Sequence, residues 1–574
     1  MAKPACLIVY SAAALAMVME SPSAFAQLTA PSQVTPQNLR PQTPSAETAI
    51  RLPGTPDGAA PAGDTAMTVL VRAVDLDGAF SELRVLTGPV LARIDRKRLS
   101  VAQIYKLAAE LEQIYSTAGY VLARIIVPPQ QLADGARLRL TVIDGFIESV
   151  DVSALPERVR NVVANRTRTL VERPRLKLDQ IERALLIAGD VPGLTLRSTL
   201  VRGTRQGGTR LVLDGEHRLI SGSAGADDRL TRSLGTWQLR GGLALNSAFG
   251  AGEQLYATGG LSTNLRAAAD GASPLTLYGG GAVIPIGTEG ITLNPEYTHS
   301  QTLTKQAGAV PGARGTFDRT GLRLRGPVGL TRKSSLYVSV TAEDIDQQMV
   351  ATDFNVPLNH DHYRVLRGGI DYATQLPWGA ALQIGAQLSK GLGGRNADDA
   401  VASGVPLSRI GATPDFVKLA ANARLTQPLP WGLRFDLIGA GQFTNGRPMM
   451  RSEQMSLDTS EALSAFASGT LNADEGLTLR GELAHPFAFQ WLSTDFAASP
   501  YLFAAAGRGW LATATVVEQA SFNAASVGTG VRSNVKIPAT QTNASVAVEV
   551  ARAFTNLSGL RQGWRANVVG AVAF

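Results

Sequence analysis

The sequence is poor in three things that most chains of its length carry: cysteine, charged residues and long apolar runs. Its 574 residues include a single cysteine, Cys6, and charged residues make up only 18%. With one thiol, a disulfide framework is excluded. Beyond the N-terminus no run of about eighteen apolar residues occurs, so the sequence offers no candidate transmembrane helix. The net charge of +7 comes from scattered basic residues, so nucleic acid is not expected as a partner.

Glycine is abundant instead, with 58 residues, and the mean hydropathy of +0.04 is close to neutral. Apolar and polar residues that alternate along strands average to such a value, as in membrane β-barrels. The last eleven residues, Trp564 to Phe574, alternate in this way. One face carries Trp564, Val568, Val572 and Phe574. This pattern predicts a closing transmembrane strand, and its terminal Phe resembles the signal read by the barrel-assembly machinery.

The N-terminus predicts export from the cytoplasm. Residues 1–26 combine Lys3, an apolar run from Cys6 to Met19 and the small-x-small site Ala24–Ala26, the pattern of a secretory signal peptide. Cleavage there removes the only cysteine and starts the mature chain at Gln27. Residues 27–66 are rich in proline, which interrupts helices, so a disordered or extended linker is predicted.

Residues 67–145 read as a small α+β unit. A strand at Val69–Val74 precedes a Ser100–Gln103 capping box, which opens an amphipathic helix ending before Gly119. A β-hairpin follows, with strands at 120–127 and 136–143. Residues 146–217 read as a second unit, with strands at 146–152, 194–201 and 209–213 around helices at 156–169 and 178–188.

These units carry motifs that are familiar in combination: Gly119-Tyr120, Val127-Pro128, Asp134-Gly135, Asp144-Gly145 and the Asp190–Gly193 turn. They resemble the POTRA domains of two-partner secretion transporters (TpsB type; the ShlB/FhaC/HecB haemolysin secretion/activation family). The resemblance implies two periplasmic POTRA domains before an outer-membrane pore. It also implies a secreted, TpsA-like exoprotein as the partner.

Residues 218–574 predict an all-β transmembrane barrel of about sixteen antiparallel strands. All six tryptophans lie in this part, as expected for aromatics that mark two membrane interfaces. Short connections are predicted at 248–253, 287–290, 326–331, 376–379 and 429–432, and long ones near 300–315, 346–360, 391–414 and 446–475. All the short ones fall at one end, the rule for periplasmic turns. Outer-membrane lipid and lipopolysaccharide are the expected surroundings.

Two inferred sites follow from the resemblance. In the POTRA fold the first hairpin strand lies at a sheet edge, where a partner segment can add by β-augmentation, unless the linker or a neighbouring domain blocks it. That edge is Tyr120, Val121, Leu122, Ala123, Arg124, Ile125, Ile126 and Val127.

The second inferred site is a lumen loop. In the family, a V-R-G-[FY] tip places its Arg against the Asp of an F-x-D strand. Asp474–Gly476 and Arg480-x-Glu482-Leu483 resemble the strand after that loop, which puts Ser464, Ala465 and Phe466 at the tip, with Ser for Arg. Phe503 and Ala505 then stand at the F-x-D strand, with Ala for Asp. Loss of both charges predicts a loop held by apolar packing through Phe466, since a single loss would leave a buried charge unpaired. A plug helix is not expected in 27–66.

Little else in the sequence suggests chemistry. His360-Asp361-His362 is expected in a solvated external loop without a third metal ligand. We therefore expect no catalytic residues, no metal and no cofactor. Two alternatives stay open at this point: a BamA-like barrel-assembly factor, and a passive porin-type channel.

Overall fold

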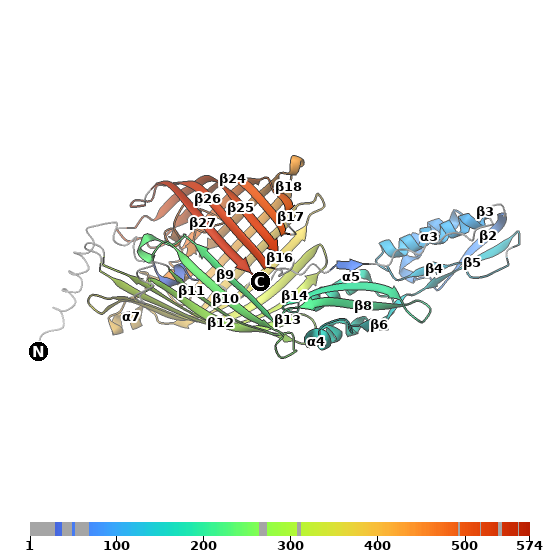
Figure 1. The fold of residues 1–574 in the computed structure, drawn as a ribbon, viewed down its shortest axis with the longest axis horizontal. Coiled ribbons are helices and arrows are strands. Elements are labelled where there is room, and N and C mark those ends of the chain that lie inside the picture. Colours follow the sequence, from blue (N-terminus) through green and yellow to red (C-terminus); the bar gives the residue numbers. More distant parts are fainter. Residues whose placement is uncertain are drawn as a thin grey trace, which may run out of the picture.

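The computed structural model describes residues 29–36, 39, 49–51, 68–131, 133–262, 273–306, 311–491, 494–516, 518–537, 542–560 and 562–574. A large barrel stands at one end of the molecule and two small α+β units extend from its other side (Figure 1). The predicted signal peptide lies outside the described residues. Within those residues, no helix combines the length and the apolar character needed to cross a membrane.

The first α+β unit is a four-stranded sheet in the order β3-β2-β5-β4. Its strands are β2 (Thr68–Asp77), β3 (Lys97–Ser100), β4 (Arg124–Ile126) and β5 (Ala136–Ile143), and its helices are α2 (Arg84–Ala92) and α3 (Val101–Thr117). The predicted capping box is present, because Ser100 and Gln103 each bond the other's backbone amide. The predicted apolar stripe of α3, from Ile104 to Tyr115, packs on the sheet.

The second unit is a sheet in the order β1-β7-β8-β6 with two helices. Its elements are β1 (Ala49–Arg51), β6 (Phe146–Asp151), α4 (Glu157–Thr167), α5 (Leu178–Gly189), β7 (Leu194–Arg202) and β8 (Gly208–His217). Gly193 closes the predicted turn at a φ of +75°, and a Cβ there would meet the Arg218 carbonyl at 2.3 Å. β1 belongs to the predicted linker, and it pairs in parallel with β7.

The barrel is a closed antiparallel sheet. Its strands are β9 (Ile220–Asp227), β10 (Gln238–Asn246), β11 (Gln254–Ser262), β12 (Leu275–Ile286), β13 (Ile291–Thr304), β14 (Ala313–Leu330), β15 (Ser334–Ala351), β16 (Val356–Gln375), β17 (Ala381–Gly394), β18 (Val417–Pro428), β19 (Arg434–Phe443), β22 (Glu475–Ala484), β23 (Phe487–Trp491), β24 (Thr494–Trp510), β25 (Ser521–Ile537), β26 (Thr542–Thr555) and β27 (Gly563–Ala573). Both β22 and β23 pair with β24, so together they occupy one strand position, and the barrel has sixteen strands. This confirms the predicted fold class and strand number.

The connections follow the predicted alternation except in two places. The turn after β14 lies at 331–333, a few residues beyond the predicted 326–331. The long external loop predicted near 346–360 is wrong: β15 and β16 extend through it, and only Thr352–Asn355 connects them. His360 and His362 therefore lie in a strand, where they contact Asp346 and Asp344.

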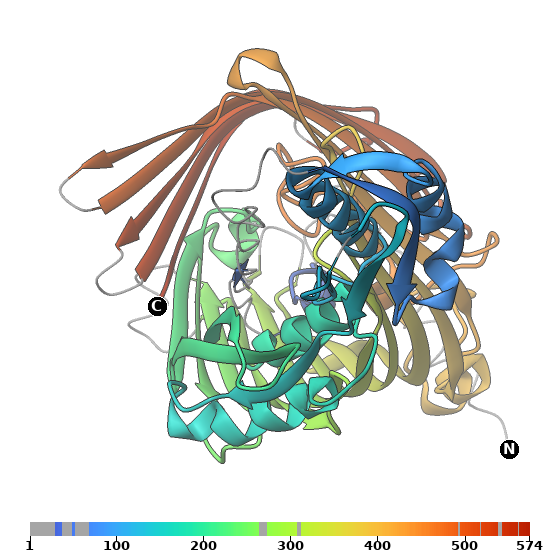
Figure 2. The same cartoon turned by 90° about the vertical axis from the view of Figure 1, so that its right-hand side faces the viewer.

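The predicted linker is not wholly disordered or extended. Within it, η2 (Pro31–Gln33) is a short helical turn against β13 and β14. Thr29, Ala30 and Pro31 are buried, and Leu39 packs on barrel residues. The dark blue segment inside the ring of strands in Figure 2 is this part of the chain. Residues 29–36 and Leu39 therefore lie in the lumen.

Candidate functional site

The connection between β19 and β22, residues 444–474, folds back into the barrel lumen. It contains η7 (Arg451–Glu453) and a two-strand ribbon of β20 (Met455–Ser456) and β21 (Asn472–Ala473). Its tip packs on the inner wall in an apolar cluster. Phe466 of the tip and Phe503 and Ala505 of the wall are all buried in this cluster.

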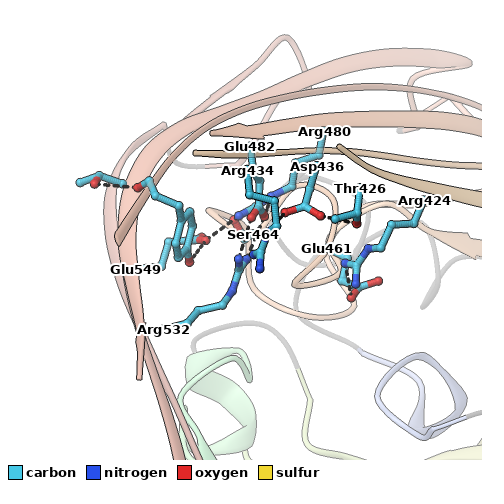
Figure 3. Close-up of polar contacts among 12 residues, drawn as sticks. Arg424, Thr426, Arg434, Asp436, Glu461, Ser464, Arg480, Glu482, Arg532 and Glu549 are labelled. Carbon is cyan, nitrogen blue, oxygen red and sulfur yellow. Dashed lines mark hydrogen bonds and ion pairs between the residues drawn. The ribbon is translucent and has the colours of Figure 1, made fainter. Parts of the chain in front are cut away.

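The tip is also held by a polar contact that the sequence analysis did not foresee. Arg480 of β22 is only 1% exposed and donates to the Ser464 hydroxyl at 2.8 Å (Figure 3). Its guanidinium forms ion pairs with Glu482 and Glu549 and lies 3.6 Å above the Phe503 ring. The resemblance implies a loop arginine against a wall aspartate, and here this polarity is reversed, because the arginine lies on the wall and the loop supplies the acceptor.

Two further wall groups bind the loop backbone. Asn567 of β27 donates to the Ser464 carbonyl at 2.9 Å. Arg229, in the connection between β9 and β10, donates to the Asp458 carbonyl at 2.6 Å and to the Ser464 carbonyl at 3.4 Å. A backbone carbonyl can accept a hydrogen bond whatever the side chain of its residue, so no sequence motif in the loop predicts these contacts.

The charged side chains around the tip are themselves paired. Arg532 of β25 binds Glu482 with both guanidinium nitrogens, at 2.7 and 2.9 Å. Arg424 of β18 reaches Glu461 of the loop at 2.8 Å. Figure 3 shows these residues converging from several strands on the loop. The loop is thus fastened to well-separated parts of the wall.

A second fastening lies at η7. Glu453 is fully buried and accepts from Arg367 at 2.6 Å, Lys418 at 2.6 Å and the Tyr363 hydroxyl at 2.8 Å. Burial opposes ionisation of Glu453, but the charges of Arg367 and Lys418 outweigh it and hold its pKa well below the ordinary value. The sequence analysis missed this residue, since its cationic partners lie on β16 and β18, far away along the chain.

The N-terminal segment fills the space between the loop and the opposite wall. Arg319 of β14 donates to the Pro36 carbonyl at 3.2 Å, and Glu296 of β13 accepts from the Leu39 amide at 3.3 Å. On the loop side, a Cβ at Gly469 would lie 2.6 Å from the Thr29 methyl. Loop and segment therefore occupy the lumen together.

The inferred receptor edge differs from the prediction. Residues 120–123 form a turn, so the strand predicted over 120–127 is wrong and β4 keeps only Arg124–Ile126. The second unit covers that turn: Leu122 packs in its core, and the Leu178 amide donates to the Gly119 carbonyl. β4 does lie at a sheet edge, but Glu112 of α3 accepts from the Ile125 amide at 3.2 Å. Val121 also packs against the second unit, and Val127 against the first.

Side-chain hydrogen bonds also connect the two α+β units next to the turn at residues 120–123. The Tyr120 hydroxyl donates to Glu82 at 3.0 Å, and Arg175 of the second unit reaches the same carboxylate at 3.4 Å. The Glu82 amide and the Tyr120 hydroxyl lower the pKa of Glu82. Burial raises the pKa of Tyr120.

The C-terminal strand alternates as predicted. Trp564, Val572 and Phe574 are exposed on the outer face, Val568 is half-buried, and Asn567 is buried on the inner face. Phe574 exchanges two backbone hydrogen bonds with Gly222 of β9 at the seam. A Cβ on Gly222 would meet the Phe574 ring at 2.5 Å, so the aromatic lies directly over that glycine.

Among the residues that the structure describes, no group of three or more His, Cys, Asp or Glu side chains is placed to hold a metal ion. The charged side chains that hold the loop, such as Arg480, Arg532 and Glu453, are instead engaged in ion pairs and hydrogen bonds.

Comparison with known proteins agrees with this architecture. A 22% identical relative, the outer membrane transporter CdiB of Escherichia coli, aligns over 83% of this chain and 79% of its own. The heme/hemopexin transporter protein HuxB of Haemophilus influenzae is 24% identical, over 28% of each chain. The solved structure of CdiB from Escherichia coli superposes with a TM-score of 0.66 at 17% identity, covering 100% of this chain and 99% of that one.

Two family models match. Residues 69–145 match the ShlB-type POTRA domain, which confirms the resemblance of the first unit. Residues 207–533 match the haemolysin secretion/activation protein ShlB/FhaC/HecB. The second match alone spans more than half of the chain, and the chain therefore belongs to the ShlB/FhaC/HecB family of haemolysin secretion/activation proteins.

Proposed function

We propose that this outer-membrane transporter of the two-partner secretion type exports one specific exoprotein, which its periplasmic POTRA domains recognise. The observation that carries the proposal is the filled lumen: a sixteen-stranded barrel encloses an aqueous channel, and here two segments of the chain occupy it. Both are held by noncovalent contacts, namely ion pairs, hydrogen bonds and packing, so both can leave and return. A passive porin has no use for receptor domains such as the two POTRA units.

Export in this proposal uses no ATP. The sequence contains no P-loop, and the periplasm supplies no nucleotide. An extended polypeptide that folds on the outer side cannot slide back, so folding itself draws the chain outward. The family is one of transporters, and no catalytic step is needed.

The receptor in this proposal is the groove between β4 and α3, centred on Ile125. A partner strand that adds to β4 needs the outward amide of Ile125, which Glu112 now holds. Ile125→Pro removes that amide and should abolish export. Glu112→Ala frees it and should preserve or increase export. If Ile125→Pro exports normally, the receptor lies elsewhere.

The function itself is tested by deleting the protein and comparing the secreted proteins in the medium. We expect one large exoprotein to disappear while other outer-membrane barrels are inserted in normal amounts. A general loss of barrels would instead indicate an assembly factor of the BamA kind. Unchanged secretion with altered uptake of small solutes would indicate a passive channel.

A further inference from the structure

The outer surface of the barrel carries a groove on β22, β24, β25 and β26, near the end with the long loops. Its volume is about 740 Å³. Its lining is mainly apolar and includes Leu477, Leu479, Ala506, Trp510, Ala525 and Phe554. The groove does not belong to the lumen site, because these side chains alternate with the inward-facing ones of the same strands.

The strand register explains the hollow. Leu479, Ala506, Ala525 and Phe554 form one row across four strands, so two methyl side chains lie between two large ones. In the next row, Gly481 lies beside Ala504. Small residues in the middle and bulky ones at the sides leave a furrow that runs along the wall.

Arg508 lines the groove, and a second arginine, Arg552, lies in a neighbouring row of the same wall outside that lining. Relative to the row of Leu479 and Ala506, Arg508 lies one row nearer the long-loop end of the barrel, where it pairs with Leu477. Arg552 lies one row farther from that end, where it pairs with Val527. Both are exposed on the outer face. Their guanidinium groups lie over the rings of Trp510 and Phe554, at 5.0 and 5.1 Å. Among the described residues, no carboxylate pairs with either arginine within salt-bridge distance, which leaves both charges available.

The height of the groove on the barrel determines which part of the membrane the two arginines contact. The short turns and the POTRA domains mark the periplasmic end of the barrel, so this groove opens toward the outer leaflet. An unpaired arginine on a lipid-facing surface is costly near the midplane and acceptable near the interface, where anionic headgroups lie. An anion at the level of the headgroups would therefore stabilise both arginines.

We propose that this groove is a binding site for a phosphorylated acyl lipid of the outer leaflet, with one phosphate at Arg508, a second phosphate at Arg552 and an acyl chain along the alanine furrow. A peptide partner fits less well. The backbone groups of β22, β24, β25 and β26 are already paired in the ladders here, so no free edge is offered to an added strand. An amphiphile needs only apolar walls and a cationic rim.

The test uses the full chain, purified in detergent and folded as judged by heat-modifiable migration. Native mass spectrometry then counts retained lipid after incubation with a bisphosphorylated, multiply acylated glucosamine disaccharide. The comparison probes are a zwitterionic lipid with the same chains and inorganic phosphate alone. We expect selective retention of the phosphorylated lipid and no effect of inorganic phosphate.

The variants separate headgroup from chain. Arg508→Gln with Arg552→Gln should weaken retention by about tenfold or more, since a charge-assisted contact is worth at least one such factor. Ala506→Leu, which fills the furrow and leaves both charges, should weaken it as well. The matched control is Arg314→Gln, an exposed arginine on β14 at the same end but outside the groove, which should retain lipid as the wild type does.

Three results would overturn the proposal. They are equal retention by the arginine double variant and the control, equal retention of the zwitterionic lipid, and full retention by Ala506→Leu. If inorganic phosphate alone displaces the lipid, the site binds a free anion and the acyl furrow has no part in it. Because both glutamine variants change only exposed outward side chains, a folded barrel is expected throughout.

Discussion

The reversed contact at the loop tip makes a specific prediction for Ser464. Ser464→Arg introduces the residue that the resemblance implies at this position, yet here it would bring a second guanidinium against Arg480. Ala505 is the register partner of Arg480, so Ala505→Asp would supply the missing carboxylate beside it. The single change should therefore loosen the loop, and the double change should fasten it again.

The size of the effect follows from the geometry. Arg480 is buried and donates to Ser464 at 2.8 Å, so a new charge at position 464 would lie within a few ångströms of it. Two like charges ~4 Å apart repel by about 4 kcal/mol at an effective dielectric of about 20. The ion pairs of Arg480 with Glu482 and Glu549 reduce this cost. We expect about 3 kcal/mol, or roughly a hundredfold rise in the population of the released loop.

The assay exploits the single cysteine. Cys6 lies in the predicted signal peptide, so Ala467→Cys gives a label site next to the loop tip in an otherwise thiol-free mature chain. A membrane-impermeant maleimide added to intact cells measures how often the tip is released. Ser464→Arg should label roughly a hundredfold faster than Ser464 itself, and Ser464→Arg with Ala505→Asp should return close to the starting rate. Equal labelling of all three, or no rescue by Ala505→Asp, would refute the reversed contact.

Three further predictions follow from other contacts. Glu453→Gln leaves Arg367 and Lys418 without their buried partner, so the loop should become protease-sensitive at a cost of about 3–5 kcal/mol, whereas Glu461→Gln at the more exposed pair should change it little. Gly222→Val should displace Phe574 from the seam, and less folded barrel should appear in heat-modifiable migration than with Gly241→Val, where the nearest contact to a Cβ is 3.7 Å. The pKa of Glu82 is lowered in the folded chain, so its contribution is present above the ordinary value of 4.5 and is lost as the pH falls through the folded pKa. The protection factor of the Leu178 amide, which is its exchange rate relative to an unprotected amide at the same pH, should therefore fall in acid, and Glu82→Gln should remove that step.

The sequence alone predicted the fold where local chemistry decides it. Periodicity, capping residues and turn residues predicted three features: the capping box at Ser100, the alternating C-terminal strand and the sixteen-stranded barrel. The helix α2 was missed, since it contains Pro89, which argues against a helix when read locally. The continuous strand over 120–127 was wrong, because burial of Leu122 in the second unit overrides the local β propensity.

The resemblance predicted which residues form the tip of a lumen loop, but it did not predict the contacts of that loop. The expected apolar packing of Phe466 is present, yet Arg480, Arg229, Asn567 and Glu453 hold the loop with charges and amides. Each of these contacts joins residues far apart in sequence, and several end on backbone carbonyls. Only a folded barrel brings such groups together, so no linear pattern could have announced them.

Locking the two lumen segments together tests most directly whether they must leave for export. A Cβ on Gly469 would lie 3.5 Å from the Cβ of Gln33, a separation that a disulfide can span. Gln33→Cys with Gly469→Cys should stop secretion of the exoprotein when oxidised and restore it on reduction, while Gly469→Cys alone secretes under both conditions. Undiminished secretion by the oxidised, disulfide-linked protein would contradict the account.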